Sequence, residues 1–286
     1  MEKRVLKKTG YNIAPVVFGG ITVTDELQED ANRYVAYAVE RGVNYFDVAP
    51  SYGNAEERLG PALAPYRKNV FLACKTVMRD SAGAKEELIN SLRFLKTDYF
   101  DVYQLHAIDT DEEIDVAFSE GGVMDTLQWA QEEGIVRKLG ITSHSEKHAL
   151  RCLELYDFDT VLYPMYWAQG VARGAGDKLT EVTRAGNIGL LCMKALTYRN
   201  WMPDEAKPDD ARQWYKYVEY GSAFALAVLK YGLSKGDALV GPGNFEALCY
   251  MLDNIDEAVA TPFSAKDFEL LSQEAEKIKG YELQFG

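Results

Sequence analysis

Residues 42–60, which read GVNYFDVAPSYGNAEERLG, contain the pattern on which the interpretation of the whole chain depends. The run 43–48 is mostly apolar but contains Asp47, and it predicts a short buried strand that ends beside an acid. A Pro/Gly loop carries Tyr52 five residues later, and Glu56 opens the next segment. Stability alone gives little reason to build such a pair, so we interpret this stretch as half of an active site.

Short apolar runs alternate with longer amphipathic segments on both sides of this stretch. The predicted strands span 15–19, 43–48, 70–75, 101–106, 136–141, 159–163, 188–193 and 238–241. The predicted helices span 27–41, 82–95, 122–133, 145–156, 176–185, 219–231 and 245–258. Eight strand–helix units in about 250 residues match the number of units and the length of an α/β fold of the (β/α)8 TIM-barrel type. No linker or composition break divides the chain, so we expect one domain spanning residues 1–286.

Two additions to the barrel are expected at its ends. Residues 4–13 predict an N-terminal β-hairpin with Thr9 and Gly10 at its turn, and residues 264–279 predict an extra C-terminal helix. A doubly wound open sheet is the alternative architecture, because it uses the same units. The loop after the first predicted strand, GGIT at 19–22, lacks the GxGxxG phosphate fingerprint, which favours the barrel.

Composition limits the classes of partner and site. The formal charge of −13 argues against nucleic acid and anionic membranes, which both require clustered Lys and Arg. We find neither a signal-peptide pattern nor an apolar run long enough to span a membrane, and we expect a cytoplasmic protein. The four cysteines are scattered along the chain and predict reduced, buried thiols: Cys74, Cys152, Cys192 and Cys249. Together with the three histidines they show no metal-ligand spacing.

Polar residues fall at corresponding ends of three neighbouring predicted strands. Asp47 ends the second strand, Lys75 the third and His106 the fourth, and Tyr52 follows Asp47. The carboxyl ends of barrel strands form the active site, so these side chains are expected to meet there. An ammonium favours the phenolate and lowers the pKa of a neighbouring tyrosine, and an aspartate would hold that ammonium in place. Each residue alone has a structural explanation, but the set predicts proton transfer to a carbonyl.

The same residues resemble the signature of the aldo-keto reductase superfamily, G-x-N-x-F-D-T-A-x-x-Y-G. The chain has Gly42, Asn44, Phe46, Asp47, Ala49, Tyr52 and Gly53 at those places, with Val48 for the usual Thr. The similarity extends to Lys75-Thr76 and to the runs 101–106 and 134–140. It implies a (β/α)8 barrel that reduces an aldehyde or ketone to an alcohol, or the reverse, with a nicotinamide dinucleotide. Tyr52 would then be the general acid, Lys75 and Asp47 would tune it, and His106 would orient the carbonyl.

The resemblance also implies which positions hold the cofactor, either NADP or NAD. They are Gly20, Ile21, Thr142, Ser143, Met193, Lys194, Gly241, Gly243 and Asn244. Thr142-Ser143 replaces the family's Ser-Asn pair, Leu162 replaces a carboxamide-binding Gln, and Met193 replaces an aromatic residue that stacks on the nicotinamide.

The region after the eighth strand bears on the choice of dinucleotide. Family members that take NADPH place Lys or Arg there, but this chain has none between Gly236 and Ala265. We therefore expect a weak preference for NADPH, although backbone N–H groups of the turn at 241–244 remain available to a phosphate.

Two other functions remain open at this stage. Lys75 lies in an apolar strand and could form a Schiff base in a lyase or isomerase, although a paired Asp47 would keep it charged. Alternatively, the changes at Leu162 and Met193 would fit a barrel kept as a binding or regulatory protein. Aromatic residues in 164–167 and in the long connection 195–218 could wall a substrate pocket or pack those loops. His144 and His148 are expected to be non-catalytic surface or packing residues.

Overall fold

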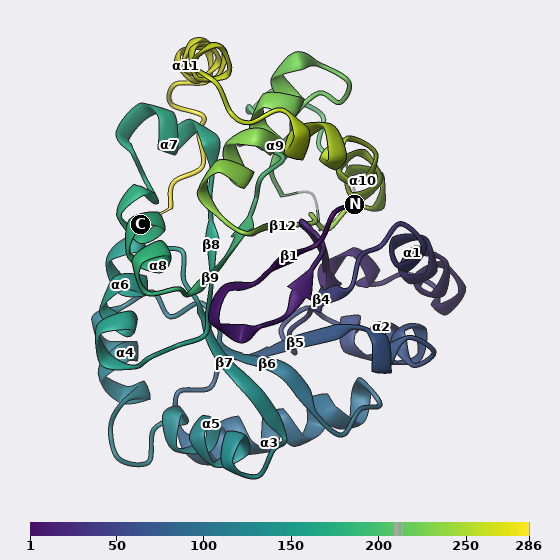
Figure 1. Ribbon diagram of the computed structural model, residues 1–286, viewed down its shortest axis with the longest axis vertical. Coiled ribbons are helices and arrows are strands. Elements are labelled where there is room, and N and C mark those ends of the chain that lie inside the picture. The colour runs from purple at the N-terminus through teal and green to yellow at the C-terminus, as the bar shows by residue number, and fades with distance from the viewer. Residues whose placement is uncertain (209–211, 213, 286) are drawn as a thin grey trace.

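The computed structural model, which describes residues 1–208, 212 and 214–285, contains a closed barrel of eight parallel strands (Figure 1). The barrel strands are β3 (Val16–Gly19), β4 (Tyr45–Asp47), β5 (Phe71–Thr76), β6 (Phe100–Leu105), β7 (Val136–Thr142), β8 (Thr160–Pro164), β9 (Gly189–Met193) and β12 (Ala238–Val240). Each pairs with its neighbour along the chain, and β12 closes the ring on β3. The predicted (β/α)8 barrel is therefore confirmed, and the open sheet is excluded.

The predicted N-terminal hairpin is also present. β1 (Arg4–Val5) pairs antiparallel with β2 (Asn12–Ile13), and the short helix η1 (Lys7–Thr9) lies between them. Gly10 ends this turn with a φ of 73°, a left-handed conformation that glycine adopts without steric cost. The hairpin crosses the middle of the barrel in Figure 1 and buries Leu6 and Ile13 completely in the interior.

Helices surround the barrel (Figure 1). They are α1 (Gln28–Glu40), α2 (Ala55–Leu63), α3 (Ser81–Phe94), α4 (Asp111–Ala117), α5 (Val123–Glu132), α6 (Glu146–Leu155), α7 (Trp167–Arg173), α8 (Asp177–Ala185), α9 (Ala223–Lys235), α10 (Phe245–Ala260) and α11 (Ala265–Lys277). Every predicted helix is present, including the extra C-terminal one, which begins with a Ser264 capping box. The prediction placed the start of α9 too early, because Ser222 caps its first turn.

Among the described residues, three α-helices and two strands were not predicted. α2 contains Pro61, and α4 and α7 have only seven residues each, so their periodicity is too short to stand out. Within the long connection after β9, β10 (Thr197–Arg199) pairs with β11 (Lys216–Tyr217). The aromatic residues at 166 and 167 are buried, and the Trp167 indole donates a hydrogen bond to the Thr197 carbonyl oxygen, so they pack this connection onto the barrel.

The inward-facing residues of three adjacent strands change from apolar to polar along the strand. Alternation places Tyr45 and Asp47 of β4 on one face, as it does Ala73 and Lys75 of β5. β6 repeats the pattern with Val102 followed by Gln104. The earlier member of each pair belongs to an apolar cluster inside the barrel, together with Leu6 and Ile13 from the hairpin. The barrel is thus closed by apolar packing at one end and lined by polar groups at the other.

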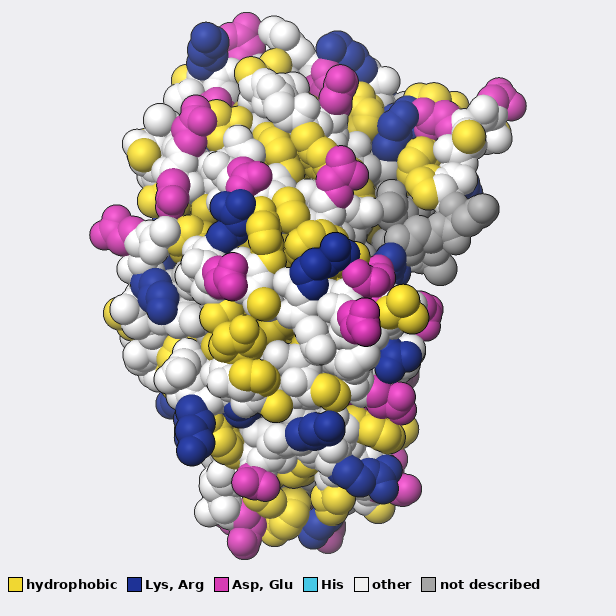
Figure 2. Space-filling model, turned by 90° about the vertical axis from the view of Figure 1, so that its right-hand side faces the viewer, with side chains coloured by type: hydrophobic (Ala, Val, Ile, Leu, Met, Phe, Trp, Pro, Cys, Tyr) yellow, Lys and Arg dark blue, Asp and Glu magenta, His cyan; other side chains and the backbone are white. Residues whose placement is uncertain are grey.

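The surface view in Figure 2 shows Lys and Arg side chains interspersed with Asp and Glu on one face of the molecule. In the described part of the chain, no helix is both long enough and apolar enough to cross a bilayer. All four cysteines are free, and three of them, Cys74, Cys152 and Cys192, are buried.

Close packing between α2 and α3 generates a prediction about stability. A Cβ at Gly60 would lie 2.2 Å from the carbonyl oxygen of Phe94 and 2.9 Å from the Cα of Leu95. Gly60→Ala is expected to lower the free energy of unfolding by about 1–3 kcal/mol, because backbone atoms cannot yield as a side chain does. Urea unfolding measures the effect.

Gly83→Ala in α3 is the matched control. Its new Cβ would meet only side-chain atoms of Asp80 and Met78, at 3.0–3.3 Å. The Asp80 carboxylate accepts from the Gly83 N–H, so it can shift only slightly, but alanine favours a helix over glycine by about 1 kcal/mol, and this variant should lose less stability than Gly60→Ala. Equal losses in the two variants would contradict the packing argument.

Candidate active site

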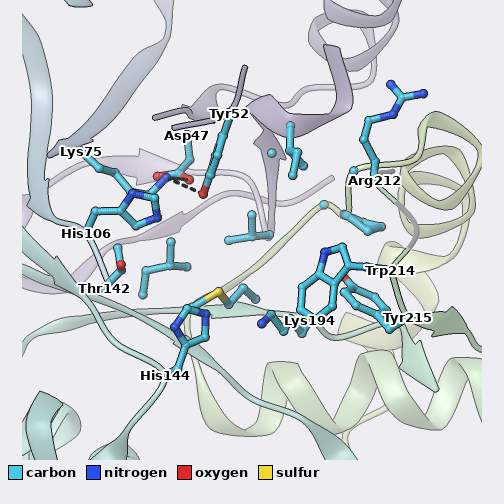
Figure 3. A pocket seen from close by; sticks show the side chains of 18 residues that line it. Asp47, Tyr52, Lys75, His106, Thr142, His144, Lys194, Arg212, Trp214 and Tyr215 are labelled. Carbon is cyan, nitrogen blue, oxygen red and sulfur yellow. Dashed lines mark hydrogen bonds and ion pairs between the residues drawn. The ribbon is translucent and has the colours of Figure 1, made fainter. Parts of the chain in front are cut away.

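A pocket of about 300 Å³ opens at the carboxyl ends of the barrel strands, and it brings together the four residues predicted to transfer a proton (Figure 3). Asp47 ends β4, Lys75 comes from β5 and His106 directly follows β6. Tyr52 reaches the same pocket from the loop after β4. The parallel register of neighbouring strands aligns these positions, since Lys75 pairs with Gln104, two residues before His106.

Lys75 is the centre of the hydrogen-bond network in this pocket. Its Nζ lies 2.6 Å from Asp47 Oδ2, and it donates to Tyr52 Oη and to the Val48 carbonyl oxygen, each at 3.2 Å. The Lys75 side chain is fully buried. Three acceptors at these distances satisfy the three N–H bonds of an ammonium, so the charge can be kept out of water.

Gln104, which the sequence interpretation missed, holds Asp47 from the other side. Its Nε2 donates a hydrogen bond of 2.9 Å to Asp47 Oδ1, so both carboxylate oxygens have partners. Strand alternation could have identified Gln104 as a site residue, because it lies two residues before His106 on the same face of β6.

The pKa values of Tyr52 and Lys75 are both raised. The charge of Lys75 alone would lower the pKa of Tyr52, and burial alone would lower that of Lys75. Burial raises the pKa of Tyr52, and the nearby Lys75 ammonium lowers it only in part, so the net pKa is raised. The predicted lowering by Lys75 is present, but it is outweighed by desolvation. Burial alone would lower the pKa of Lys75, whereas Asp47 and Tyr52 raise it above its usual value.

His106 stands beside Tyr52 with its ring edge-on, the two ring centroids 5.7 Å apart. Its Nδ1 lies 3.4 Å from Ser51 Oγ. Its own carbonyl oxygen accepts a 2.7 Å hydrogen bond from Arg79, which fixes the strand end. Burial, together with the positive charge of Lys75, lowers the pKa of His106 to about 3, so the imidazole is neutral at physiological pH.

Six of the nine predicted cofactor positions line the pocket: Ile21, Thr142, Met193, Lys194, Gly241 and Gly243. The other three do not. Asn244 caps α10 by accepting from the Ala247 backbone, and Ser143 Oγ donates to Asp109 Oδ1 at 2.8 Å. Gly20 lies against β4, since a Cβ there would be 2.8 Å from the Asp47 carbonyl oxygen.

Several lining residues lie outside the predicted set. His144, expected on the surface or in packing, borders the pocket with its Nδ1 2.9 Å from Asp109 Oδ2. Trp214 and Tyr215 come from the long connection after β9, so those two aromatic residues do wall the pocket. Arg212 comes from the same connection, and no local pattern marks it because the connection is ordered by contacts distant in the sequence.

The pocket wall fits a nicotinamide dinucleotide in chemistry. Ile21, Leu162 and Met193 provide apolar contact for a ring, while Lys194 brings positive charge for a phosphate. The glycine-containing loops approach closely, because a Cβ at Gly19 would lie 2.3 Å from the Gly241 carbonyl oxygen. Only glycine therefore lets these two strand ends lie this close together beside the pocket.

Comparisons with known proteins place the chain in a family. The model described as aldo/keto reductase family matches residues 15–225. Because this match spans more than half of the 286 residues, the protein belongs to the aldo-keto reductase family. The resemblance seen in the sequence is therefore confirmed.

Individual relatives agree with this assignment. The uncharacterized oxidoreductase YqkF of Bacillus subtilis (strain 168) is 32% identical over 157 residues, which are 50% of this chain and 49% of that protein. The aldo-keto reductase YhdN of the same organism is 27% identical over 250 residues, which are 78% of this chain and 72% of that protein. The chain thus spans about half the length of the first of these relatives. The holo form of aldo-keto reductase AKR11C1 from Bacillus halodurans shares the fold, with a TM-score of 0.73 and 21% identity over 99% and 98% of the chains.

The lowered pKa of His106 predicts an acid-sensitive contribution to stability. The unfolded chain binds a proton at this residue below about pH 6.5, whereas the folded protein does not until about pH 3. This contribution is therefore complete above pH 6.5 and is lost as the pH falls towards 3. His106→Asn removes it, so the melting temperature of the native protein should fall relative to the variant between pH 7.5 and 4.5.

Thermal unfolding of both proteins across that range measures this difference. His106→Gln, a second neutral replacement, should show the same trend. A difference in melting temperature that stays constant with pH would show that the folded protein does not exclude the proton.

Proposed function

We propose that the protein is an oxidoreductase that interconverts a carbonyl compound and an alcohol with a nicotinamide dinucleotide. The observation that carries this proposal is the fully buried Lys75, bonded at once to Asp47 and to the Tyr52 hydroxyl in a pocket that can admit a ligand. Family membership supports the same reaction class.

Tyr52 is proposed as the general acid. Its raised pKa keeps the phenol protonated at neutral pH, so it has a proton to give to a carbonyl oxygen. The Lys75 ammonium, 3.2 Å from Oη, stabilises the phenolate that remains. Asp47 holds that ammonium charged and fixed. In the oxidative direction the phenolate takes the proton back.

His106 is proposed to position the carbonyl. A neutral imidazole can donate one hydrogen bond without adding a charge, and Ser51 lies beside its other polar edge. The bound dinucleotide would supply or accept the hydride. Thr142, Met193 and the turn containing Gly241 and Gly243 would hold it at the wall of the pocket.

The alternative reactions have less support. A Schiff base requires a neutral amine, but Asp47 and Tyr52 raise the pKa of Lys75 and keep it protonated. A purely binding role leaves the Asp47, Tyr52, Lys75 and His106 arrangement without a purpose. We further propose a small-molecule carbonyl or alcohol as the partner and the cytoplasm as the location, with the four free cysteines in favour of a reducing compartment.

Tyr52→Phe tests the assignment of the acid. Without the hydroxyl, kcat for carbonyl reduction should fall by about 10²–10⁴-fold. Steady-state kinetics over a panel of aldehydes and ketones with both dinucleotides measures this loss, and cofactor titration by fluorescence shows whether binding persists.

Tyr99→Phe is the matched control, because Tyr99 precedes β6 at the opposite end of the barrel, where its ring packs against Arg67 and Arg137. It should retain native kcat. Full reductase activity in Tyr52→Phe would refute the mechanism.

We also propose that the protein binds NADH and NADPH with similar affinity. No Lys or Arg lies between Gly236 and Ala265, and the guanidinium of Arg212, which does reach the pocket, is 2.7 Å from Glu26 Oε1. It also donates to the Thr22 and Thr24 carbonyl oxygens. An uncompensated phosphate would gain little from a cation already engaged in this way.

Titration of the protein with NADPH and NADH, followed by tryptophan fluorescence, tests this proposal. The two Kd values should agree within about tenfold, a difference of 1.4 kcal/mol. A preference for NADPH beyond about a hundredfold would contradict it. Repeating the titration with Arg212→Gln would then show whether Arg212 supplies the preference.

A further inference from the structure

A largely buried guanidinium lies between the segments that follow β5 and β6. It belongs to Arg79, whose side chain is 13% exposed. Nη2 donates to the His106 carbonyl oxygen at 2.7 Å and to the Ala107 carbonyl oxygen at 3.1 Å. Nη1 donates to the Val77 carbonyl oxygen at 3.1 Å. The rigid, planar group therefore connects the end of one barrel strand with the end of the next.

The backbone of His106 is bonded on both sides. Its N–H donates to the Thr76 carbonyl oxygen at 2.9 Å, and its carbonyl oxygen accepts from Arg79. Because Thr76 directly follows Lys75, these bonds place His106 relative to the buried ammonium.

The imidazole of His106 is held less firmly than its backbone. Within the described part of the chain it makes one hydrogen-bond contact, the 3.4 Å approach of Nδ1 to Ser51 Oγ. This distance is long for a hydrogen bond, and Ser51 is exposed. The orientation of the ring therefore depends mainly on where the backbone is fixed.

The residue after His106 has an unusual backbone conformation. Ala107 has a φ of 50°, in the left-handed region that residues other than glycine rarely adopt. Its N–H donates to Thr142 Oγ1 at 2.7 Å, and its carbonyl oxygen accepts from Arg79. Such a conformation persists where the surrounding structure requires it. Without the guanidinium, Ala107 could relax, and the direction of the His106 side chain would change with it.

Glu113 on α4 fixes the guanidinium in turn. Its Oε1 lies 3.1 Å from Arg79 Nη2, and its Oε2 accepts from the Asp109 backbone N–H at 3.0 Å. One carboxylate thus holds both the cation and the loop that leads from His106 to α4. Arg79 is not among the described residues that line the pocket, so it can affect a ligand there only through the residues that it holds.

We propose that Arg79 is a positioning residue, which keeps His106 in the orientation that lets its imidazole bind the substrate carbonyl. This inference rests on the proposed function, which assigns the carbonyl to His106. A displacement of about 1 Å in a reacting arrangement can lower a rate by about a hundredfold, so a residue outside the pocket can have a large effect. That effect should pass through His106.

A double-mutant cycle tests this route. Arg79→Met removes the guanidinium and keeps an unbranched side chain. In the native background it should lower kcat/KM for carbonyl reduction by about tenfold or more. In the His106→Ala background the same change should cost about twofold or less, because the group that Arg79 positions is already gone. Equal losses in the two backgrounds would overturn the proposal.

Arg93→Met is the matched control, because Arg93 is exposed on α3 and donates to Asn90 in the same helix. It should keep native kcat/KM. If circular dichroism shows that Arg79→Met does not fold, Arg79→Lys takes its place in the cycle. One ammonium cannot span both segments as a guanidinium does, so the same pattern of losses is expected.

Cofactor titration checks a different route. Ala107 is also bonded to Thr142, one of the residues proposed to hold the dinucleotide. Arg79→Met should change the Kd for NADH and NADPH by about twofold or less. A rise of about tenfold in both Kd values, with equal losses of kcat/KM in the two backgrounds, would show that Arg79 acts through Thr142 instead.

A measurement without substrate separates this proposal from the reductase function itself. The chain has three histidines, so the imidazole signals of the ¹⁵N-labelled protein can be assigned by NMR with His106→Ala. Arg79→Met should shift the His106 signals, and Arg93→Met should leave all three histidines unchanged. If no carbonyl compound is reduced but the His106 signals shift, the reductase assignment fails and the positioning of the imidazole stands. If reduction occurs and the signals do not shift, the positioning role fails alone.

Discussion

The buried ion pair between Lys75 and Asp47 is the interaction on which the rest of the site depends. Removing two charges from water costs several kcal/mol for each ion, and only complete hydrogen bonding offsets that cost. Val48, Tyr52 and Gln104 supply the remaining bonds, so the tyrosine hydroxyl is fixed as part of satisfying the lysine. The requirement that stabilises a buried cation therefore also places the Tyr52 hydroxyl at the pocket.

Much of the fold and the polar half of the site could be predicted, because local patterns encode them. Alternating apolar and amphipathic segments predicted the barrel, and residues at strand ends predicted which side chains would meet. The contact between Gln104 and Asp47 could not be predicted, because it depends on the register between β4, β5 and β6, which no single segment of sequence contains. The short helices α4 and α7 have too few turns to show a period.

The side of the pocket opposite Tyr52 was predicted less completely for a different reason. Its residues come from the long connection after β9, from the end of the chain and from the loop after β7. Their proximity depends on tertiary contacts, such as the hydrogen bond between Asn200 and the Tyr281 carbonyl oxygen. His144 illustrates the limit, since only the folded structure shows that it borders the pocket.

The strand order has a consequence for how the protein can change during evolution. Asp47, Tyr52, Lys75 and His106 all come from β4 through β6 and their following loops, whereas most of the opposite wall comes from β7 through β12, with Gly19 and Ile21 added from the end of β3 and the segment after it. Substitutions in separate parts of a protein with no shared partners act almost additively. A new cofactor or substrate preference could therefore be built by altering the second half of the chain, while the residues proposed to transfer the proton, in the first half, are inherited unchanged.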